Sequence, residues 1–139
     1  MFVGTFNHNI DDKKRLIMPA KFRNELGNEA VMTVGHDHSI AIYTSSEWNK
    51  LQEKLMAMNF NNSNARKYIR IIAGSACSFS LDSQGRVVLP LNLIKHSNID
   101  KEVVLVGDLD HIELWSKENW DKYYNDSIEG FDDISEGLE

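Results

Sequence analysis

The chain has 139 residues, of which 42% are hydrophobic and 26% are charged. This length and composition suit one domain, or two small units, with a buried hydrophobic core. The sequence has no apolar run of about 18 residues and only one cysteine, Cys77, which excludes a membrane-spanning helix and an intrachain disulfide. Its first residues lack the basic and apolar regions of a secretory signal. We therefore expect a cytoplasmic protein that has no membrane partner and whose Cys77 is a buried structural thiol.

Charge is unevenly distributed along the chain. The net charge is −6, but residues 126–139 hold six acidic residues and no basic one, which leaves 15 acidic and 15 basic residues in the rest. Residues 11–23 contain five basic and two acidic residues, and such a local patch sets the field that a phosphate meets. We interpret 126–139 as an acidic, partly disordered tail that could also compete with nucleic acid for the basic patch.

The first half of the chain predicts strands, a helix, a hairpin and a second helix. Pro19 suits the first turn of a helix because its missing N–H is not needed there, and Gly27 is a typical helix stop. Thr44 and Glu47 form the signature of a capping box at the start of the next helix. The expected elements are strands at 4–10 and 15–18, a helix at 20–26, hairpin strands at 30–34 and 39–43, and a helix carrying Trp48, Leu51, Leu55 and Met58 on one face.

The second half begins after a polar, asparagine-rich break at 60–64. A helix at 65–74 carries Arg66, Lys67 and Arg70, for which a solvated face and a DNA-flanking role are equally supported. Strands at 76–81 and 86–89, a helical turn at 91–96, strands at 102–106 and 111–115, and a helix from 116 to 124 follow. We therefore divide the chain into 1–60, 61–125 and the acidic tail 126–139.

The chain is a duplicated unit. The pattern Asp, three turn-like residues, Arg, three aliphatics and Pro runs from Asp11 to Pro19 and again, 71 residues later, from Asp82 to Pro90; these are the only two prolines. At a spacing of 72, residues 31–35 pair with 103–107 and 40–43 with 112–115. This organisation predicts an α+β fold in which strands of the two units interleave and cover each other's edges. The aliphatic residues before the prolines are assigned to the core: Leu16, Ile17, Met18, Val87, Val88 and Leu89.

In a chain that begins Met1-Phe2-Val3-Gly4, the doubled motif resembles the MraZ family of bacterial transcriptional regulators, from Met1 to about Tyr124. Each repeat is similar to the AbrB-type swapped-hairpin module, whose signature ends in a similar Gly-Arg-Val-Val-Leu-Pro. The resemblance implies two pseudo-symmetric, AbrB-like, double-psi-barrel-like repeats with intervening and C-terminal helices. The first copy departs from the family pattern, because Lys14 stands where the second copy has the family's glycine, Gly85. Lysine at positive φ costs energy, so the geometry of the first turn is left open.

The resemblance implies that both turns face DNA, so the aspartate and arginine of each copy are carried over as DNA-binding residues. A turn-opening aspartate can accept hydrogen bonds from backbone N–H groups two residues on and can orient the arginine four residues on. The planar arginine fork then donates two parallel hydrogen bonds to phosphate or guanine. Two lysines add phosphate contacts, and a glutamine opposite one of them can bond a base or phosphate. The candidate residues are Asp11, Lys13, Lys14, Arg15, Asp82, Gln84 and Arg86.

The family further implies ring-like homo-oligomers that bind direct repeats in the promoter of a cell-division and cell-wall gene cluster, including the regulator's own gene. The expected protein is thus a nucleoid-associated, sequence-specific regulator of double-stranded DNA, without cofactor and without enzymatic activity. A bland alternative is that Asp-x-x-x-Arg only closes a hairpin through a surface ion pair, worth about 0–1 kcal/mol. Another is an oligomeric protein-interaction scaffold that uses the acidic tail and no nucleic acid; salt-dependent DNA binding separates the two.

One segment could suggest an enzyme. His36, Asp37 and His38 lie at a hairpin tip, and Asp108, Asp110 and His111 occupy the corresponding hairpin. A zinc site needs three or four converging ligands, and the spacing in the sequence brings no further candidate ligands to these histidines. A polar hairpin tip is therefore favoured over the site of a metal-dependent hydrolase. We expect no metal site.

Overall fold

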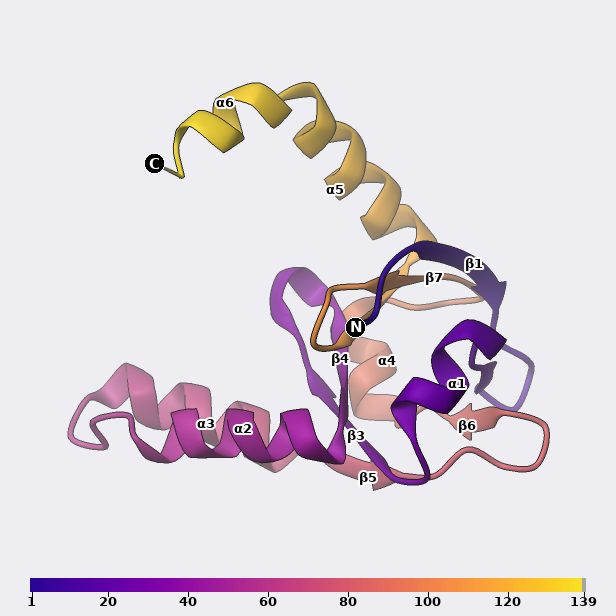
Figure 1. Cartoon of the computed structure of the whole chain (residues 1–139), viewed down its shortest axis with the longest axis horizontal. Helices are drawn as coiled ribbons and strands as arrows, with labels where there is room; N and C mark the ends of the chain where they lie inside the picture. The colour runs from indigo at the N-terminus through magenta and orange to yellow at the C-terminus, as the bar shows by residue number, and fades with distance from the viewer. Residues whose placement is uncertain (139) are drawn as a thin grey trace.

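The structure, a computed structural model that describes residues 1–138, contains one six-stranded antiparallel sheet, a two-stranded ribbon and six α-helices (Figure 1). The strands are β1 (Thr5–Asn9), β2 (Arg15–Ile17), β3 (Ala30–Val34), β4 (Ile40–Thr44), β5 (Cys77–Phe79), β6 (Arg86–Val88), β7 (Glu102–Gly107) and β8 (Ile112–Ser116). The helices are α1 (Ala20–Leu26), α2 (Ser45–Met56), α3 (Ser63–Ser75), α4 (Leu91–Ser97), α5 (Lys117–Glu129) and α6 (Phe131–Glu136), with a 3-10 turn η1 (His36–His38). The predicted α+β class is confirmed.

The two repeats exchange strands. The large sheet has the order β1-β7-β8-β4-β3-β5, so the first strand of each repeat pairs with the hairpin of the other repeat. The two hairpins meet at the centre through β4 and β8, and β2 pairs with β6 in the separate ribbon. The order of the sheet is therefore the same when it is followed from either end, with β1 equivalent to β5, β7 to β3 and β8 to β4. This confirms the predicted interleaving of two pseudo-symmetric units. Neither repeat has a complete sheet without the other.

The hydrophobic core is drawn from both repeats. Its largest fully buried side chains are Leu16, Met18, Phe22, Leu26, Met32, Ile40, Ile42, Leu89, Leu93, Leu105, Ile112 and Leu114. Two residues that we assigned to the core are instead exposed, Ile17 by 44% and Val88 by 60%. Successive side chains of a strand point to opposite faces, so in these three-residue strands only the central residue, Leu16 or Val87, points inward.

Helix ends follow the local sequence signals. The side-chain oxygen of Thr44 accepts a hydrogen bond from the backbone N–H of Glu47, and Ser116 does the same for Asn119. The capping box is only half formed, since the Glu47 carboxylate pairs with Lys50. Gly27 ends α1 at a φ of +81°, a conformation that favours glycine.

Two helical arms extend from the body, the α2–α3 hairpin and the α5–α6 arm, both away from the end where β6 and its turn lie (Figure 1). Most of the segment that we interpreted as a partly disordered tail is helical, because α5 continues to Glu129 and α6 covers Phe131–Glu136; the last residue of that segment, 139, lies outside the described residues. Our boundary at 60/61 falls in the loop between α2 and α3, and that at 125/126 falls inside α5. Among the described residues, no helix has the length and apolarity needed to cross a bilayer.

Candidate nucleic-acid interface

The first repeated turn is a three-residue hairpin loop locked by Asp11. The Asp11 carboxylate oxygen Oδ1 accepts hydrogen bonds from the backbone N–H groups of Lys13 and Arg15, both at 2.9 Å. The N–H of Lys14 donates to the Asp11 carbonyl at 3.0 Å, and Lys14 itself has a φ of +62°. A turn followed by one left-handed residue is a common three-residue hairpin connection. Lys14 therefore adopts the left-handed geometry in spite of its side chain.

The second turn repeats this geometry. Asp82 Oδ1 accepts from the N–H groups of Gln84 at 2.9 Å and Arg86 at 2.8 Å, and Gly85, with a φ of +77°, donates to the Asp82 carbonyl. In both turns the aspartate therefore accepts a hydrogen bond from the backbone N–H of the arginine four residues on.

Each aspartate also fixes its arginine side chain. Asp11 Oδ2 accepts from Arg15 Nε at 2.7 Å, and Asp82 Oδ2 accepts from Arg86 Nε at 2.8 Å. The arginine side chains remain about a quarter exposed, 28% and 27%. Because the pairing uses Nε, the two terminal nitrogens of each guanidinium are left to meet a ligand. The result is an oriented donor fork on each turn.

Both carboxylates stay ionised at neutral pH. Hydrogen bonding by the backbone N–H of Arg15, helped by its side chain and by the N–H of Lys13, holds the pKa of Asp11 below its ordinary 3.8, against a smaller effect of burial. Hydrogen bonding by Arg86 and Gln84 lowers the pKa of Asp82 in the same way.

The ribbon ties the two turns to one another. The Met18 N–H donates to the Gly85 carbonyl at 2.8 Å, and the Leu89 N–H donates to the Lys14 carbonyl at 2.9 Å. Each left-handed residue is therefore hydrogen-bonded to the residue that directly follows the ribbon strand of the other repeat. In the β2–β6 register Arg15 lies opposite Val88, so the turns share one rigid support.

The outer face of the ribbon brings the two arginines together. Strand alternation places Arg15, Ile17, Arg86 and Val88 on this face, because directly opposite residues of an antiparallel pair share a side. Arg15, Asp82, Arg86 and Val88 also line one shallow hollow of about 340 Å³. We call Arg15, Ile17, Arg86 and Val88 the ribbon face.

A family model described as "MraZ protein, putative antitoxin-like" matches the chain twice, over residues 1–71 and 72–138. The chain belongs to the MraZ family. It is 42% identical over 138 residues to "Transcriptional regulator MraZ" of Clostridium tetani, covering 99% of this chain and 96% of that protein.

Other members of the MraZ family are similar over most of their length. A protein of the same name from Limosilactobacillus fermentum is 40% identical over 139 residues, 100% of this chain and 97% of the relative. One from Clostridium acetobutylicum is 43% identical over 129 residues, 93% and 91% of the two chains. The predicted resemblance and the duplication are confirmed, and MraZ membership places the chain among transcriptional regulators rather than enzymes.

Different residues supply the positive charge at the two turns of the chain. The first turn carries Lys13 and Lys14, whereas the residues between Asp82 and Arg86 are uncharged. Arg23 of α1 supplies the second turn: its Nε donates to the Met18 carbonyl at 2.8 Å, and a Cβ on Gly85 would lie 2.5 Å from its guanidinium. Gly85 therefore leaves room for Arg23 in addition to adopting positive φ.

Sequence reasoning did not assign Arg23, Ile17 or Val88 to the site. From the sequence Arg23 belongs only to the basic patch at 11–23, because no sequence signal places it beside the second turn. No polar–apolar alternation marks Ile17 and Val88 as exposed, because two consecutive aliphatic residues follow the arginine in each copy, and strands of three residues are too short to show which face is buried.

The histidines of the η1 hairpin diverge. His36 Nε2 lies 3.1 Å from the Tyr68 hydroxyl, and His38 Nδ1 lies 3.2 Å from the His96 carbonyl, so the two rings have different partners. Cys77, which we expected to be buried, is exposed, because β5 is an edge strand of the sheet.

The equivalent β7–β8 hairpin instead gathers three groups of the kinds that bind metals, Asp108, His111 and Glu113, whose ligand atoms lie within 4.8 Å of one another. Burial lowers the pKa of His111, but hydrogen bonds to Glu113 and Asp110 and the charge of Asp108 outweigh it and raise the pKa to about 9. At neutral pH the ring is therefore an imidazolium that joins these carboxylates, and a metal would have to displace its proton.

Proposed function

We propose that this MraZ-family chain is a sequence-specific regulator that binds double-stranded DNA through the ribbon face and its two turns. The observation that carries the proposal is the pair of arginine forks, each oriented by an aspartate on one rigid ribbon. The major groove, about 12 Å wide, admits a two-stranded β-ribbon. If the aspartate and arginine only closed a hairpin through a surface ion pair, neither the duplication nor the shared face would be needed. Both features therefore favour DNA binding over that alternative.

Each site residue has a distinct proposed role. Arg15 and Arg86 contact guanine edges or phosphates, while Asp11 and Asp82 hold them in place. Gln84 bonds a base or a phosphate. Lys13 and Lys14 contact phosphates, which fix the position of the protein on the duplex without reading its sequence.

The finer features of the proposal concern assembly and target. We propose ring-like homo-oligomers that bind direct repeats in a promoter of a cell-division and cell-wall cluster, including the protein's own gene, in the cytoplasm at the nucleoid. Few basic residues surround the ribbon face of each copy, so one copy binds DNA weakly. Several tethered copies on one DNA raise the affinity through effective concentration.

The test is an electrophoretic shift with DNA from upstream of the protein's own gene, across a salt series. The wild type should give a specific shift that weakens steeply with salt, because bound phosphates release counterions. Arg15→Ala/Arg86→Ala should abolish the specific shift, whereas Lys122→Ala, which removes a charge from α5, should preserve it. An unshifted wild type that is still oligomeric by light scattering would favour the scaffold, and a double variant that binds like wild type would refute the role of the arginines.

A further inference from the structure

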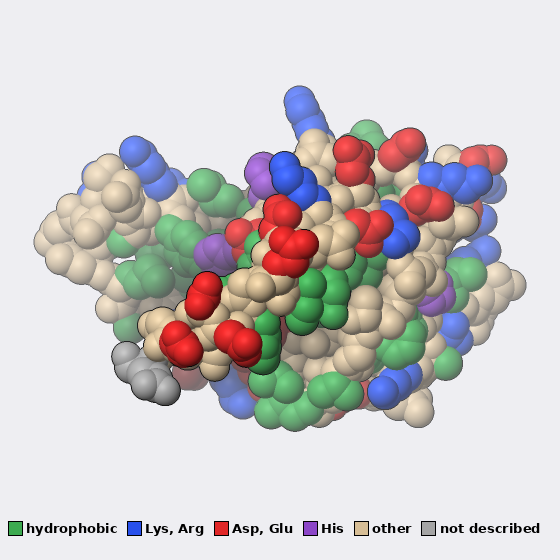
Figure 2. Space-filling view, turned by 90° about the horizontal axis from the view of Figure 1, so that it is seen from above, with side chains coloured by type: hydrophobic (Ala, Val, Ile, Leu, Met, Phe, Trp, Pro, Cys, Tyr) green, Lys and Arg blue, Asp and Glu red, His purple; other side chains and the backbone are tan. Residues whose placement is uncertain are grey.

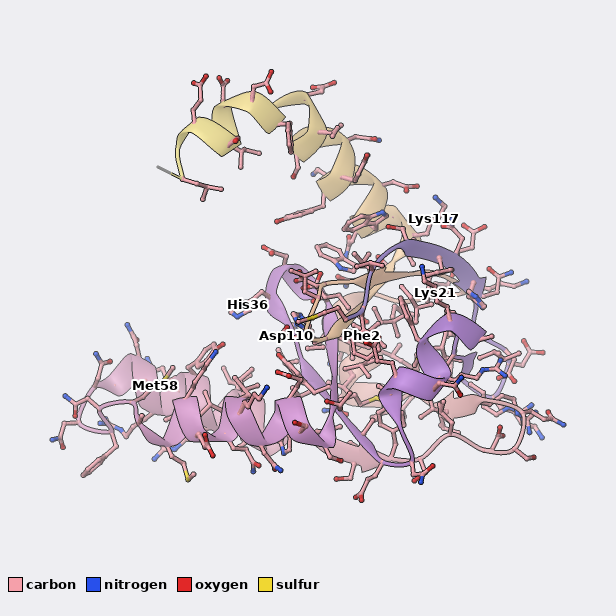
Figure 3. All side chains as sticks on the ribbon, in the orientation of Figure 1. Phe2, Lys21, His36, Met58, Asp110 and Lys117 are labelled. Atoms are coloured by element: carbon pink, nitrogen blue, oxygen red, sulfur yellow. The ribbon has the colours of Figure 1, made fainter. Side chains whose placement is uncertain are left out.

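A hollow of about 490 Å³ lies between η1, the β7–β8 hairpin and α5. Small-molecule sites have volumes of about 300–1,000 Å³, so the hollow is large enough for a small ligand. In Figure 3, η1 with His36 and the hairpin with Asp110 lie next to one another beneath α5. The hollow therefore has walls from both repeats and from the C-terminal helix.

Aromatic rings form one part of this wall. The ring centroid of Trp115 lies 4.9 Å from that of Tyr123 and 5.2 Å from that of Trp120. Trp115, on β8, is 3% exposed, whereas Tyr123, on α5, is 44% exposed. The buried indole thus supports two rings of α5 that still offer surface to a ligand. Aromatic faces carry negative potential and attract cations, which bind within about 6 Å of a ring centroid.

Carboxylates form another part of the wall. Asp37 comes from η1, and Asp108 and Glu113 come from the β7–β8 hairpin. His111 Nε2 lies 3.6 Å from Asp108 Oδ2 and 3.5 Å from Glu113 Oε2, so one imidazolium is shared by these two groups. No lysine or arginine lines the hollow, which leaves more negative than positive charge there. Acidic side chains also gather on the face that α5 and α6 cross in Figure 2.

The charge of Asp37 acts directly on the aromatic wall. It raises the pKa of the Tyr123 hydroxyl above its ordinary 10.0, which places the carboxylate of η1 close to a ring of α5. Burial raises the pKa of Tyr43 to about 12 and also raises the pKa of Asp108, and both residues line the same hollow. Perturbed side-chain pKa values that gather in one cleft are typical of functional sites.

The two loops that carry the carboxylates are held by hydrogen bonds. The Phe2 N–H donates to the Leu109 carbonyl at 2.8 Å, and the Leu109 N–H donates to the Phe2 carbonyl at 2.9 Å. In η1, the Ser39 hydroxyl donates to the His36 carbonyl at 2.8 Å. The site is therefore formed before a ligand arrives, and binding needs little ordering of the protein.

We propose that this hollow binds a small organic cation, an ammonium or guanidinium group on a short aliphatic chain. The cation lies against the rings of Trp120 and Tyr123 and pairs with Asp37. Both kinds of wall attract an organic cation, whereas an anion or a neutral ligand gains nothing from the carboxylates.

An organic cation also suits the hollow better than a metal ion. A metal would have to displace the proton of His111 to reach Asp108 and Glu113. A cation that pairs with Asp37 leaves the His111 cluster intact. The inference does not rest on the proposed function, because none of the lining residues belongs to the ribbon face or the two turns.

Isothermal titration calorimetry on the full-length protein tests the proposal, with butylguanidinium as the probe and its neutral isostere butylurea as the comparison. We expect saturable binding of butylguanidinium and none of butylurea, because only the first carries the charge that the site recognises. Magnesium chloride at the same ionic strength as a sodium chloride control should not displace the probe, since it gains nothing from the aromatic rings.

Two variants locate the site. Asp37→Asn should weaken butylguanidinium binding by about fivefold or more, because it removes the charged partner. Trp120→Leu, which keeps an apolar side chain but removes the ring, should weaken it by about three- to tenfold. The matched controls are Asp126→Asn, at an exposed carboxylate of α5 outside the hollow, and Phe60→Leu, at an exposed ring of the α2–α3 loop. Both controls should bind like wild type, and circular dichroism verifies that all four variants are folded.

The absence of binding would overturn the proposal, as would equal affinity for butylurea, displacement of the probe by magnesium, or wild-type affinity in both site variants. None of these results bears on the gel-shift test of Arg15 and Arg86, so the proposed function and the cation site stand or fall separately.

Discussion

At the residue scale, the two turns solve the same geometric problem with different side chains. Lys14 and Gly85 both occupy the left-handed region, where a side chain costs energy and glycine does not. The lysine adopts this conformation in a turn that is held by five hydrogen bonds: three to the Asp11 carboxylate, one to the Asp11 carbonyl, and one from the Asp11 N–H to the Arg15 carbonyl. It provides a positive charge that the second turn obtains from Arg23.

Replacing Lys14 with glycine should therefore separate stability from binding. We expect Lys14→Gly to raise the free energy of unfolding by about 1 kcal/mol, because it relieves the left-handed strain, and to weaken DNA binding through the lost charge. Urea denaturation measures the first effect. Lys13→Gly is the matched control and should be neutral or destabilising; equal destabilisation by both changes would contradict the strain at Lys14.

Arg23 should count as a phosphate contact. Arg23→Ala is expected to weaken binding to any DNA sequence and to reduce the slope of log affinity against log salt by about 0.9 for each engaged copy. Fluorescence anisotropy over a salt series gives the slope. Lys122→Ala should leave it unchanged, and an unchanged slope for Arg23→Ala would show that its guanidinium serves only to brace the second turn.

His111 makes stability depend on pH on the alkaline side. Its folded-state pKa of about 9 lies above the ordinary 6.5, so its stabilisation is complete below 6.5 and is lost as the pH rises through 9. The groups that face the His111 ring are Asp108, Asp110, Glu113 and Tyr43. Burial raises the pKa of Tyr43 to about 12, so Tyr43 does not titrate in this pH range. His111→Gln should flatten the fall in unfolding free energy, at most about 3 kcal/mol, between pH 6.5 and 9. The same slope in both proteins would exclude the charged cluster as its source.

At the element scale, local signals predicted helix ends well and the ribbon poorly. Pro19, Gly27, Thr44 and Ser116 act through neighbouring backbone groups, so their positions were readable from sequence. The side that a strand presents depends on its pairing, which is set by residues about 70 positions away. The helical tail was missed for another reason: acidic composition masked the apolar spacing of Tyr124, Ile128 and Phe131.

The ribbon face predicts a contrast between neighbouring aliphatic residues. Ile17→Ser/Val88→Ser should change stability by less than about 1 kcal/mol, since both side chains are exposed, but should weaken DNA binding by removing apolar contacts to the groove. Leu16→Ala, at a fully buried position of the same strand, should cost about 2–5 kcal/mol. Thermal unfolding and shift assays on the three proteins decide. Wild-type affinity in the serine double variant would move the DNA contact away from this face.

At the scale of the whole molecule, duplication explains why the site exists. Each repeat needs the other to complete its sheet, and the same exchange brings two turns onto one ribbon. The sequence disclosed the repeat and the two aspartate–arginine pairs, because both are written as motifs. It did not disclose the approach of Arg23 to Gly85, because this arises only when distant segments are folded.

The central claim is that oriented arginine forks, and not positive charge alone, read the DNA. The most direct measurement is the ratio of affinities for the protein's own upstream DNA and for a scrambled duplex of equal length, in wild type and in Arg15→Lys/Arg86→Lys. Lysine keeps the charge but lacks the planar fork, so we predict that the ratio falls by about tenfold or more while the salt dependence is retained. An unchanged ratio would mean that specificity resides elsewhere and would contradict the account.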